Sequence, residues 1–381
     1  MLASLASNFC ITDRLVIILR YLLYRNDMYN FPILLLAFLV FIHHVDSRAS
    51  VNEFFDEMQN PSNCTGLEYV VVEMGCGGGF AAHFQLAASE WLRNAKAVEY
   101  SKPVLIIGHI RGYSEGPECE LVKKDWTCFF LPMSACQGTL LLTGKRIDTN
   151  TQHVSFDDSI IPKQFLGIGL AYWWGVVQQR MFRLQPMVMQ HVLEEAAKMD
   201  GGKGFPFGSP IAGVHVRHGD KGSDGFRSHS LEAEMAVVRN SPECRNASSN
   251  ASNSNDQLRI FVASDDGNVL LAAKKLGHLV DSEGVSQQTS SVGMFSTLLS
   301  HPALGYNASL EIITDIYFLS RCSTLIGIAA SQVFRMAVGI SNASHTLKHA
   351  VAMDHNQLPR IRHMSAKYGL PLPESFFPGT Q

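Results

Sequence analysis

The chain has 381 residues, of which 46% are hydrophobic and 17% charged, and its formal net charge is −3. This hydrophobic fraction is sufficient for an ordinary buried core, and the length favours two domains of typical size. The near-neutral charge balance excludes a chain built for non-specific nucleic-acid binding, and we expect no nucleic-acid partner.

The first predicted element is an apolar run near the N-terminus, Phe31–Ile42. Three basic residues precede it, Arg14, Arg20 and Arg25, so the positive-inside rule places the N-terminal end in the cytosol. This order is typical of a type II signal anchor. The run has only twelve residues, whereas a membrane helix needs about 20. Translation from Met28 would instead produce a cleavable signal peptide and a secreted protein.

We therefore predict a single-pass type II Golgi membrane protein whose C-terminal bulk is lumenal. Its first segments are a cytosolic tail over residues 1–28, a signal anchor over 29–45 and a short stem over 46–63. Five N-x-S/T glycosylation sites follow the apolar run, which is the order expected when the C-terminal bulk enters the secretory lumen; they are Asn63, Asn246, Asn250, Asn307 and Asn342.

Seven of the eight cysteines also follow the apolar run. Their odd number means that at least one is free or forms an intermolecular bond. An oxidising lumen favours disulfides, although spacing alone does not give the pairing. Zinc binding is the alternative, and no C-x-x-C pair supports it.

A β–turn–α–β unit is predicted after the stem, over residues 67–110. A strand leads into the glycine-rich turn GCGGG, an amphipathic helix follows, and PVLIIGHI is the second strand. A glycine-rich turn before a helix brings backbone N–H groups close to a phosphate or a sugar, which makes Gly77 and Gly79 candidate donor-binding residues. A tight turn without a ligand is the alternative.

A long helical region is predicted over Gly169–Met199, with a break at Pro186. The aromatic residues Tyr172, Trp173 and Trp174 are expected to pack in the core. Glycines and prolines then favour a linker over Gly201–Pro210.

The second half alternates strands with helices, which predicts an α/β fold with a parallel sheet covered on both faces. In such sheets, ligands bind beyond the carboxyl ends of the strands. The predicted strands are 211–216, 258–264 and 323–329, and the predicted helices are 231–240, 267–277, 311–322 and 331–340.

The richest polar cluster follows the first of these strands, in the segment VRHGDKGSD. The planar fork of Arg217 could bind a diphosphate through two hydrogen bonds, or could form a structural salt bridge. Asp220 and Lys221 could orient this arginine or neutralise a leaving group, and Asp224 could be a general base or a plain loop residue.

Two histidines flank Arg217 in sequence, His215 and His218. They could bind a metal, but no third ligand converges with them in the sequence, and we expect no metal.

The second strand ends in Asp265 and Asp266. Either carboxylate could cap the helix that begins at Gly267. A carboxylate pair is also what a metal-dependent glycosyltransferase uses to hold a nucleotide diphosphate, so that alternative stays open.

The third strand ends in Ser331 and Gln332, which open a helix. A hydroxyl group beside unpaired N–H groups at a helix N-terminus can bind phosphate, and simple capping explains the residues equally well. Asp315 lies on an otherwise apolar helix, where an acid needs a partner, for example a guanine N–H pair.

The order of three motifs, GVHVRHGDK, VASDD and TDIYFLSRCSTLIGIAASQVFRMA, resembles the C-terminal half of the α1,6-fucosyltransferase family. That family includes the N-glycan core fucosyltransferase and the bacterial Nod-factor fucosyltransferases. GCGGGFAAHFQLA and WTCFFLPMSAC resemble its N-terminal half.

This resemblance implies a GT-B-like architecture of two facing Rossmann-like domains with parallel sheets. It also implies GDP-fucose as the donor, inversion at the fucose anomeric carbon, no metal, and α1,6 linkage to a GlcNAc-containing glycan resembling the N-glycan core. The implied domains are an N-terminal α/β domain over 64–200 and a GDP-sugar-binding domain over 205–345, followed by a C-terminal extension over 346–381.

The resemblance also implies roles for individual residues. Arg217 binds the diphosphate with His215 beside it, Asp315 accepts from guanine, and Ser331 and Gln332 contact the phosphates and the substrate. The remaining implied features are active-site polar roles for Asp220, Lys221, Asp265 and Asp266, and a disulfide between Cys64 and Cys136.

The chain departs from the family pattern at several positions. His218 stands where the family has a second arginine, and Gly219 where it has threonine. The carboxylate expected to activate the acceptor falls at Gly225, one residue after Asp224. The alternative functions are therefore a protein O-fucosyltransferase or another GDP-sugar transferase, and a catalytically inactive glycan-binding protein.

Overall fold

A computed structural model describes the fold over residues 51–74, 79–122, 124–207, 211–218, 229–240, 259–280, 301–344, 346–354 and 357–367. The predicted cytosolic tail and signal anchor lie outside these ranges. No helix within the described ranges is both long and apolar enough to cross a membrane. The elements below belong to the compact unit that begins at Asp56.

The predicted β–turn–α–β unit is confirmed in the N-terminal part of this unit. Strand β1 (Glu68–Glu73) leads into helix α3 (Phe80–Ala97), which returns to β2 (Val104–Ile107). After α4 (Gln137–Thr143), the short strand β3 (Lys145–Ile147) pairs with the other side of β1. The three strands are parallel in the order β2-β1-β3.

Aromatic rings fill the space beside this sheet. Phe84 and Phe130 lie edge to face with their centroids 5.5 Å apart, and Trp126 lies 4.4 Å from Phe130. Rings of this size remove a large apolar area from water, and tilted or edge-to-face contacts suit their quadrupoles. The connecting segments contain short 3₁₀ helices. These are η2 (Pro117–Val122), η3 (Trp126–Cys128), η4 (Asp158–Ile160), η5 (Lys163–Ile168) and, later in the chain, η9 (Pro302–Leu304).

Two disulfides lie within this N-terminal part. Cys64–Cys136 confirms the pairing that the family resemblance implies. Cys119–Cys128 was not predicted from the sequence. Cys322 is a free, buried cysteine, which agrees with the odd number of cysteines after the apolar run.

The predicted break at Pro186 is also confirmed. Helix α5 (Leu170–Met181) ends before it, and α6 (Pro186–Gly202) begins with this proline, whose missing N–H costs nothing at a first helical position. Trp173 and Trp174 are buried, as expected. Near its end α6 loses helical geometry at Met199–Gly201, just where the predicted linker begins.

The second sheet is parallel in the order β5-β4-β6-β7. Its strands are β4 (Ile211–Val216), β5 (Arg259–Ser264), β6 (Thr324–Gly327) and β7 (His349–Ala352). All six residues of β4 are buried, as expected for a central parallel strand covered on both faces. The predicted α/β class is therefore confirmed, with two parallel sheets.

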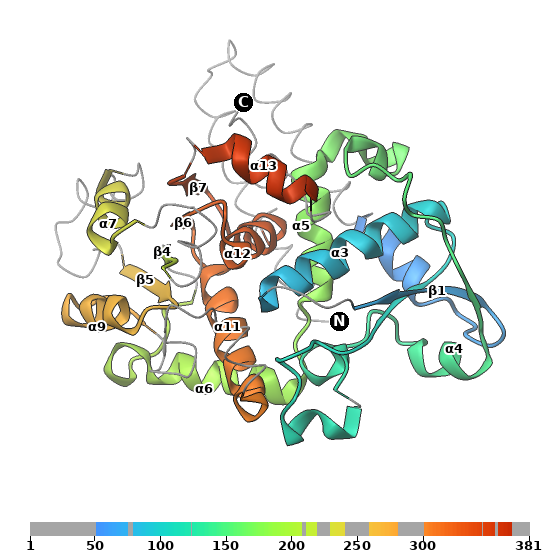
Figure 1. Cartoon of the computed structure of the whole chain (residues 1–381), viewed down its shortest axis with the longest axis horizontal. Helices are drawn as coiled ribbons and strands as arrows, with labels where there is room; N and C mark the ends of the chain where they lie inside the picture. The colour runs from blue at the N-terminus through green and yellow to red at the C-terminus, as the bar shows by residue number, and fades with distance from the viewer. Residues whose placement is uncertain are drawn as a thin grey trace, which may run out of the picture. The chain divides into compact units, whose positions relative to one another are not determined.

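Helices cover this sheet on both faces. Helix α7 (Leu231–Asn240) and helix α9 (Gly267–Lys275) pack their apolar side chains against β4 and β5, and Figure 1 shows both on the same side of these strands. Phe318 of α11 (Gly305–Leu319) contacts Phe261 of β5 at a centroid distance of 5.5 Å. The last helices are α12 (Gln332–Ala343) and α13 (Leu358–Lys367).

Two elements of this half differ from the sequence prediction. Helix α11 begins at Gly305, six residues before the predicted start, because Tyr306, Ala308 and Leu310 already carry a buried apolar face. Strand β7 was not predicted, and it lies in the segment expected to be a C-terminal extension.

Helices α5 and α12 approach each other closely at two glycines. A Cβ atom added to Gly175 would lie 2.4 Å from the carbonyl oxygen of Gly339, which is backbone and cannot turn aside. This contact leaves no space for a methyl group, so the glycine is required for packing.

We therefore expect Gly175→Ala to destabilise the fold by roughly 1–3 kcal/mol through overpacking. Alanine in place of glycine inside a helix normally stabilises it by up to about 1 kcal/mol. Gly138→Ala, in α4, is the matched control, since no atom lies within 4 Å of its added Cβ. Urea unfolding measures both changes, and a stabilised Gly175→Ala variant would contradict the close packing.

Candidate functional site

Polar side chains meet at the carboxyl edge of the second sheet, as the sequence predicts. Because β4 and β5 are parallel neighbours with Val216 opposite Ser264, the residues that follow both strands emerge side by side. Arg217 and His218 follow β4, and Asp265 and Asp266 follow β5.

Arg217 forms an ion pair with Asp265 through Nη1 and Oδ2. The other carboxylate oxygen, Oδ1, accepts a hydrogen bond from the backbone N–H of His218 at 2.9 Å. The side chains are only 22% and 13% exposed, so water screens the pair weakly. Asp265 therefore fixes the direction in which Arg217 leaves the strand.

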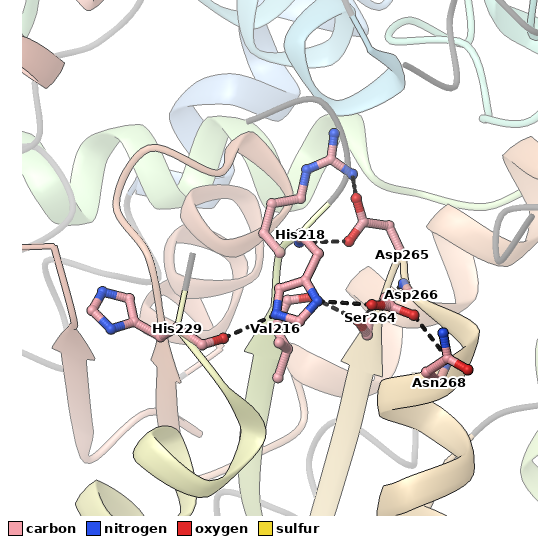
Figure 2. Close-up of polar contacts among 8 residues, drawn as sticks. Val216, His218, His229, Ser264, Asp265, Asp266 and Asn268 are labelled. Carbon is pink, nitrogen blue, oxygen red and sulfur yellow. Dashed lines mark hydrogen bonds and ion pairs between the residues drawn. The ribbon is translucent and has the colours of Figure 1, made fainter. Parts of the chain in front are cut away.

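His218 lies between two hydrogen-bond acceptors (Figure 2). Its Nδ1 is 2.8 Å from Oδ2 of Asp266, and its Nε2 is 3.1 Å from the carbonyl oxygen of His229. A neutral imidazole can donate from only one nitrogen, whereas the doubly protonated ring can donate to both partners. The geometry therefore favours the cation.

The electrostatics agree with this assignment. Burial lowers the pKa of His218, but the Asp266 carboxylate and the His229 carbonyl outweigh it, so the net pKa is raised. Burial likewise raises the pKa of Asp266, but the hydrogen bond and charge of His218 and the Asn268 N–H outweigh it, and its net pKa is lowered. The raised pKa of His218 and the lowered pKa of Asp266 both result from the ion pair between these two side chains.

Asp266 also caps α9, since its Oδ1 accepts from the N–H of Asn268 at 2.9 Å. The capping alternative is thus confirmed for this residue. Ser264 was missed in the sequence analysis. Its hydroxyl donates to the carbonyl of Val216 at 2.8 Å and accepts from the N–H of Asp266 at 3.1 Å, which ties the ends of β4 and β5 together.

His215 is buried against helix α12. It is 4% exposed, and its ring lies nearly parallel to that of Phe334 on α12, with centroids 6.4 Å apart. Burial, with the nearby charge of Arg217 adding to it, lowers its pKa to about 3. His215 is thus neutral and packs β4 against α12. Within the described ranges, no three His, Cys, Asp or Glu side chains converge as a metal site.

The turn after β6 brings the N-terminus of α12 to the same sheet edge. Ser331 is buried, and its hydroxyl accepts from the N–H of Phe334 at 3.5 Å as the helix cap. Gln332 is half-buried at the first helical position. Capping by Ser331 does not prevent phosphate binding at this position, because a capped helix still carries positive potential at its N-terminus.

The remaining predicted residues divide into two groups. Asp315 lies half-buried within α11, and Gly79 is the N-cap residue of α3. Their ligand contacts stay predictions. Four others lie outside the described residues, namely Gly77, Asp220, Lys221 and Asp224.

Comparison with known proteins identifies the family to which this chain is similar. The model of the α-(1,6)-fucosyltransferase N- and catalytic domains matches residues 157–350, about half of the chain, including β4, β5 and β6 with the polar cluster. An α-(1,6)-fucosyltransferase of Drosophila melanogaster is 26% identical over 320 residues, which cover 76% of this chain and 47% of that protein. The chain thus spans about half the length of this curated relative.

Solved structures with a similar chain trace include NodZ α-1,6-fucosyltransferase soaked with GDP-fucose, at 16% identity and a TM-score of 0.37, covering 72% of this chain and 92% of that one. A second is fucosyltransferase NodZ from Bradyrhizobium, at 15% identity and a TM-score of 0.34, covering 72% and 93%. On the family match over residues 157–350, the chain belongs to the α1,6-fucosyltransferase family.

Proposed function

We propose that this chain transfers fucose from GDP-fucose to a glycan hydroxyl, with inversion, and forms an α1,6 linkage to a GlcNAc-containing acceptor. The observation that carries the proposal is the cationic pair Arg217 and His218, oriented by Asp265 and Asp266 at the carboxyl edge of the sheet. Family membership supports the same chemistry.

The proposed reaction breaks the bond between the fucose anomeric carbon and the diphosphate oxygen. The bonding electron pair leaves with GDP, and the acceptor oxygen forms the new bond from the opposite face of the ring. Negative charge therefore develops on the departing diphosphate, where a guanidinium, an imidazolium and helix N–H groups stabilise it. We propose that Arg217 and the N-terminus of α12 supply hydrogen bonds, with no metal required. His218 adds only its positive charge, because both of its ring nitrogens already bond Asp266 and the His229 carbonyl.

The acceptor hydroxyl must also lose a proton. Asp265 and Asp266 suit this role poorly, because their oxygens already accept from Arg217, His218 and the N–H of Asn268. We retain Asp224 as the proposed base, and Asp220 and Lys221 as polar neighbours of the diphosphate.

We further propose a Golgi location with the apolar run as a type II anchor, and domains over 64–200 and 205–345. Two predicted glycosylation sites, Asn63 and Asn307, are exposed, which supports a lumenal catalytic part. Removal of N-glycans from the protein expressed in animal cells is expected to increase its gel mobility. Unchanged mobility would argue against the lumenal orientation.

The direct test incubates the purified full-length chain with labelled GDP-fucose, with and without EDTA. An N-glycan, a chitooligosaccharide and a folded protein domain serve as acceptors, and digestion with a linkage-specific fucosidase identifies the bond. We expect EDTA-resistant transfer to a GlcNAc-containing sugar. Transfer only to the folded domain would favour a protein O-fucosyltransferase, and binding of GDP-fucose without transfer to any acceptor would favour an inactive glycan-binding protein.

A further inference from the structure

The turn after β6 is held by a buried carboxylate that follows the neighbouring strand β7. Asp354 follows β7 by two residues and is fully buried. Its Oδ1 accepts from the N–H of Ala329 at 2.7 Å, and its Oδ2 accepts from the N–H of Ala330 at 3.0 Å. One carboxylate that binds two consecutive N–H groups fixes the orientation of both peptide units.

A buried arginine holds the same turn from the other side. Nε of Arg335, on α12, donates to the carbonyl oxygen of Ala329, and Nη1 donates to the hydroxyl of Ser365, on α13, at 3.0 Å. Ala329 thus has its N–H bound by one charged side chain and its carbonyl by another. Arg335 is 1% exposed, so these hydrogen bonds lie away from water and are correspondingly strong.

A second buried acid, Glu234, lies near enough to Asp354 to be affected by its charge. Glu234 of α7 is also fully buried, and neither of its oxygens forms a hydrogen bond with the described residues. Burial, with the charge of Asp354 adding to it, raises the pKa of Glu234 to about 9, so this side chain is uncharged at neutral pH. Glu234 therefore adds no second negative charge beside the Asp354 carboxylate.

The turn after β6 determines the position of the N-terminus of α12. Ser331 follows Ala330 directly, its N–H donates to the carbonyl of Ile328 at 3.0 Å, and its hydroxyl caps the helix. A shift of the peptide units at Ala329 or Ala330 would displace both the hydroxyl and the first N–H groups of α12.

We propose that Asp354 is a positioning residue of the donor site, which sets the β6–α12 turn so that Ser331 and the first N–H groups of α12 meet the diphosphate of a nucleoside-diphosphate sugar. The proposal rests on the proposed function. Asp354 does not touch the donor in this account. It acts through Ala329 and Ala330, because small misplacements of binding groups cost large factors in affinity and rate.

The test substitutes Asp354→Asn, which keeps one acceptor oxygen and places an NH₂ group against one of the two N–H groups. We expect the Kd for GDP and the KM for GDP-fucose to rise roughly 10-fold, the effect of losing one good hydrogen bond and more. The KM for the acceptor should stay within about 2-fold, since the turn serves only the donor. Calorimetric titration and initial rates measure these values on the full-length chain.

Asp157→Asn is the matched control. Asp157 also accepts from a backbone N–H, that of Ser159 at 2.9 Å, but it caps η4 and lies outside the second sheet. We expect its GDP affinity to be unchanged. If Asp354→Asn does not fold, Ser365→Ala decides, because it removes only the acceptor of Arg335 Nη1 and should raise the Kd for GDP about 3-fold.

These measurements distinguish a failure of the positioning role of Asp354 from a failure of the proposed fucosyl transfer. A wild-type chain that does not bind GDP overturns the proposed function and this inference together. A wild-type chain that binds GDP, with a folded Asp354→Asn variant of equal affinity, overturns the inference alone. A lower melting temperature with unchanged GDP affinity would likewise assign Asp354 a purely structural role.

Discussion

Arg217→Ala is expected to lower kcat/KM for GDP-fucose by about 100-fold or more. Loss of one preorganised donor from a developing oxyanion costs about 10²–10³ in rate, and Arg217 contributes a full charge as well. Arg217→Lys keeps the charge but not the planar fork, and should recover only part of the activity. Initial rates at saturating acceptor and the Kd for GDP measure both variants.

The Arg217–Asp265 ion pair requires a specific control. Removing the arginine alone leaves Asp265 partly buried without this charge partner, which can reduce activity for a structural reason. The double variant Arg217→Ala/Asp265→Ala removes both charges. If Arg217 binds the diphosphate, the double variant stays inactive, and recovery of activity would assign the arginine a structural role.

Arg259→Ala is the matched control for charge. Arg259 begins β5, at the opposite end of the strand from Asp265, and pairs with Asp200. The variant loses the same charge as Arg217→Ala, and we expect it to transfer fucose at nearly the wild-type rate. An Arg217→Ala variant as active as Arg259→Ala would contradict the proposed diphosphate contact.

The second large effect concerns pH. His218 has a raised pKa in the folded chain, compared with its ordinary value of 6.5. Its cation is fully present below 6.5 and is lost as the pH rises through the raised value. We therefore expect GDP-fucose affinity to fall about 10-fold across that range, and the stabilising contribution of the His218–Asp266 pair to be lost over the same window.

Three variants isolate His218 from other titrations. His218→Arg should remove the pH step and hold high affinity, whereas His218→Gln should hold low affinity at all pH values. His229→Gln keeps the backbone carbonyl that His218 uses, so its pH step should persist. His215 does not contribute, because its pKa is about 3.

GDP-fucose is the correct titrant for this measurement. Its diphosphate is a diester, whereas the terminal phosphate of GDP itself ionises with a second pKa of about 6 and would obscure the step. A pH step that survives in His218→Arg would show that another group is responsible.

Three strands of the second sheet, β4, β5 and β6, could be predicted because their signals are local. The run IAGVHV is buried on both faces and reads as a continuous apolar strand, and Asp266 before Gly267 is a strong helix cap. Since parallel strands end at one edge, topology places the residues after β4 and β5 near each other. The ion pair between Arg217 and Asp265 was not predicted, because the sequence favoured Asp220 and Lys221 as the residues that orient Arg217.

The missed features depend on contacts that are distant in sequence. His218 meets the carbonyl of His229 across eleven positions, and a backbone acceptor leaves no residue-type signal. Strand β7 has only four residues, none of them fully buried, so its apolar signal is short and weak. Asp354 is one acid in a polar segment, and its role appears only once β7 brings it beside the turn at Ala329.

A crystal structure of the full-length chain with GDP would locate the diphosphate directly. We expect the diphosphate at the carboxyl edge of the second sheet, within hydrogen-bond distance of the Arg217 guanidinium and the N-terminus of α12 at Ser331. A diphosphate bound elsewhere, for example at the glycine-rich turn before α3 with Arg217 still paired only to Asp265, would contradict it.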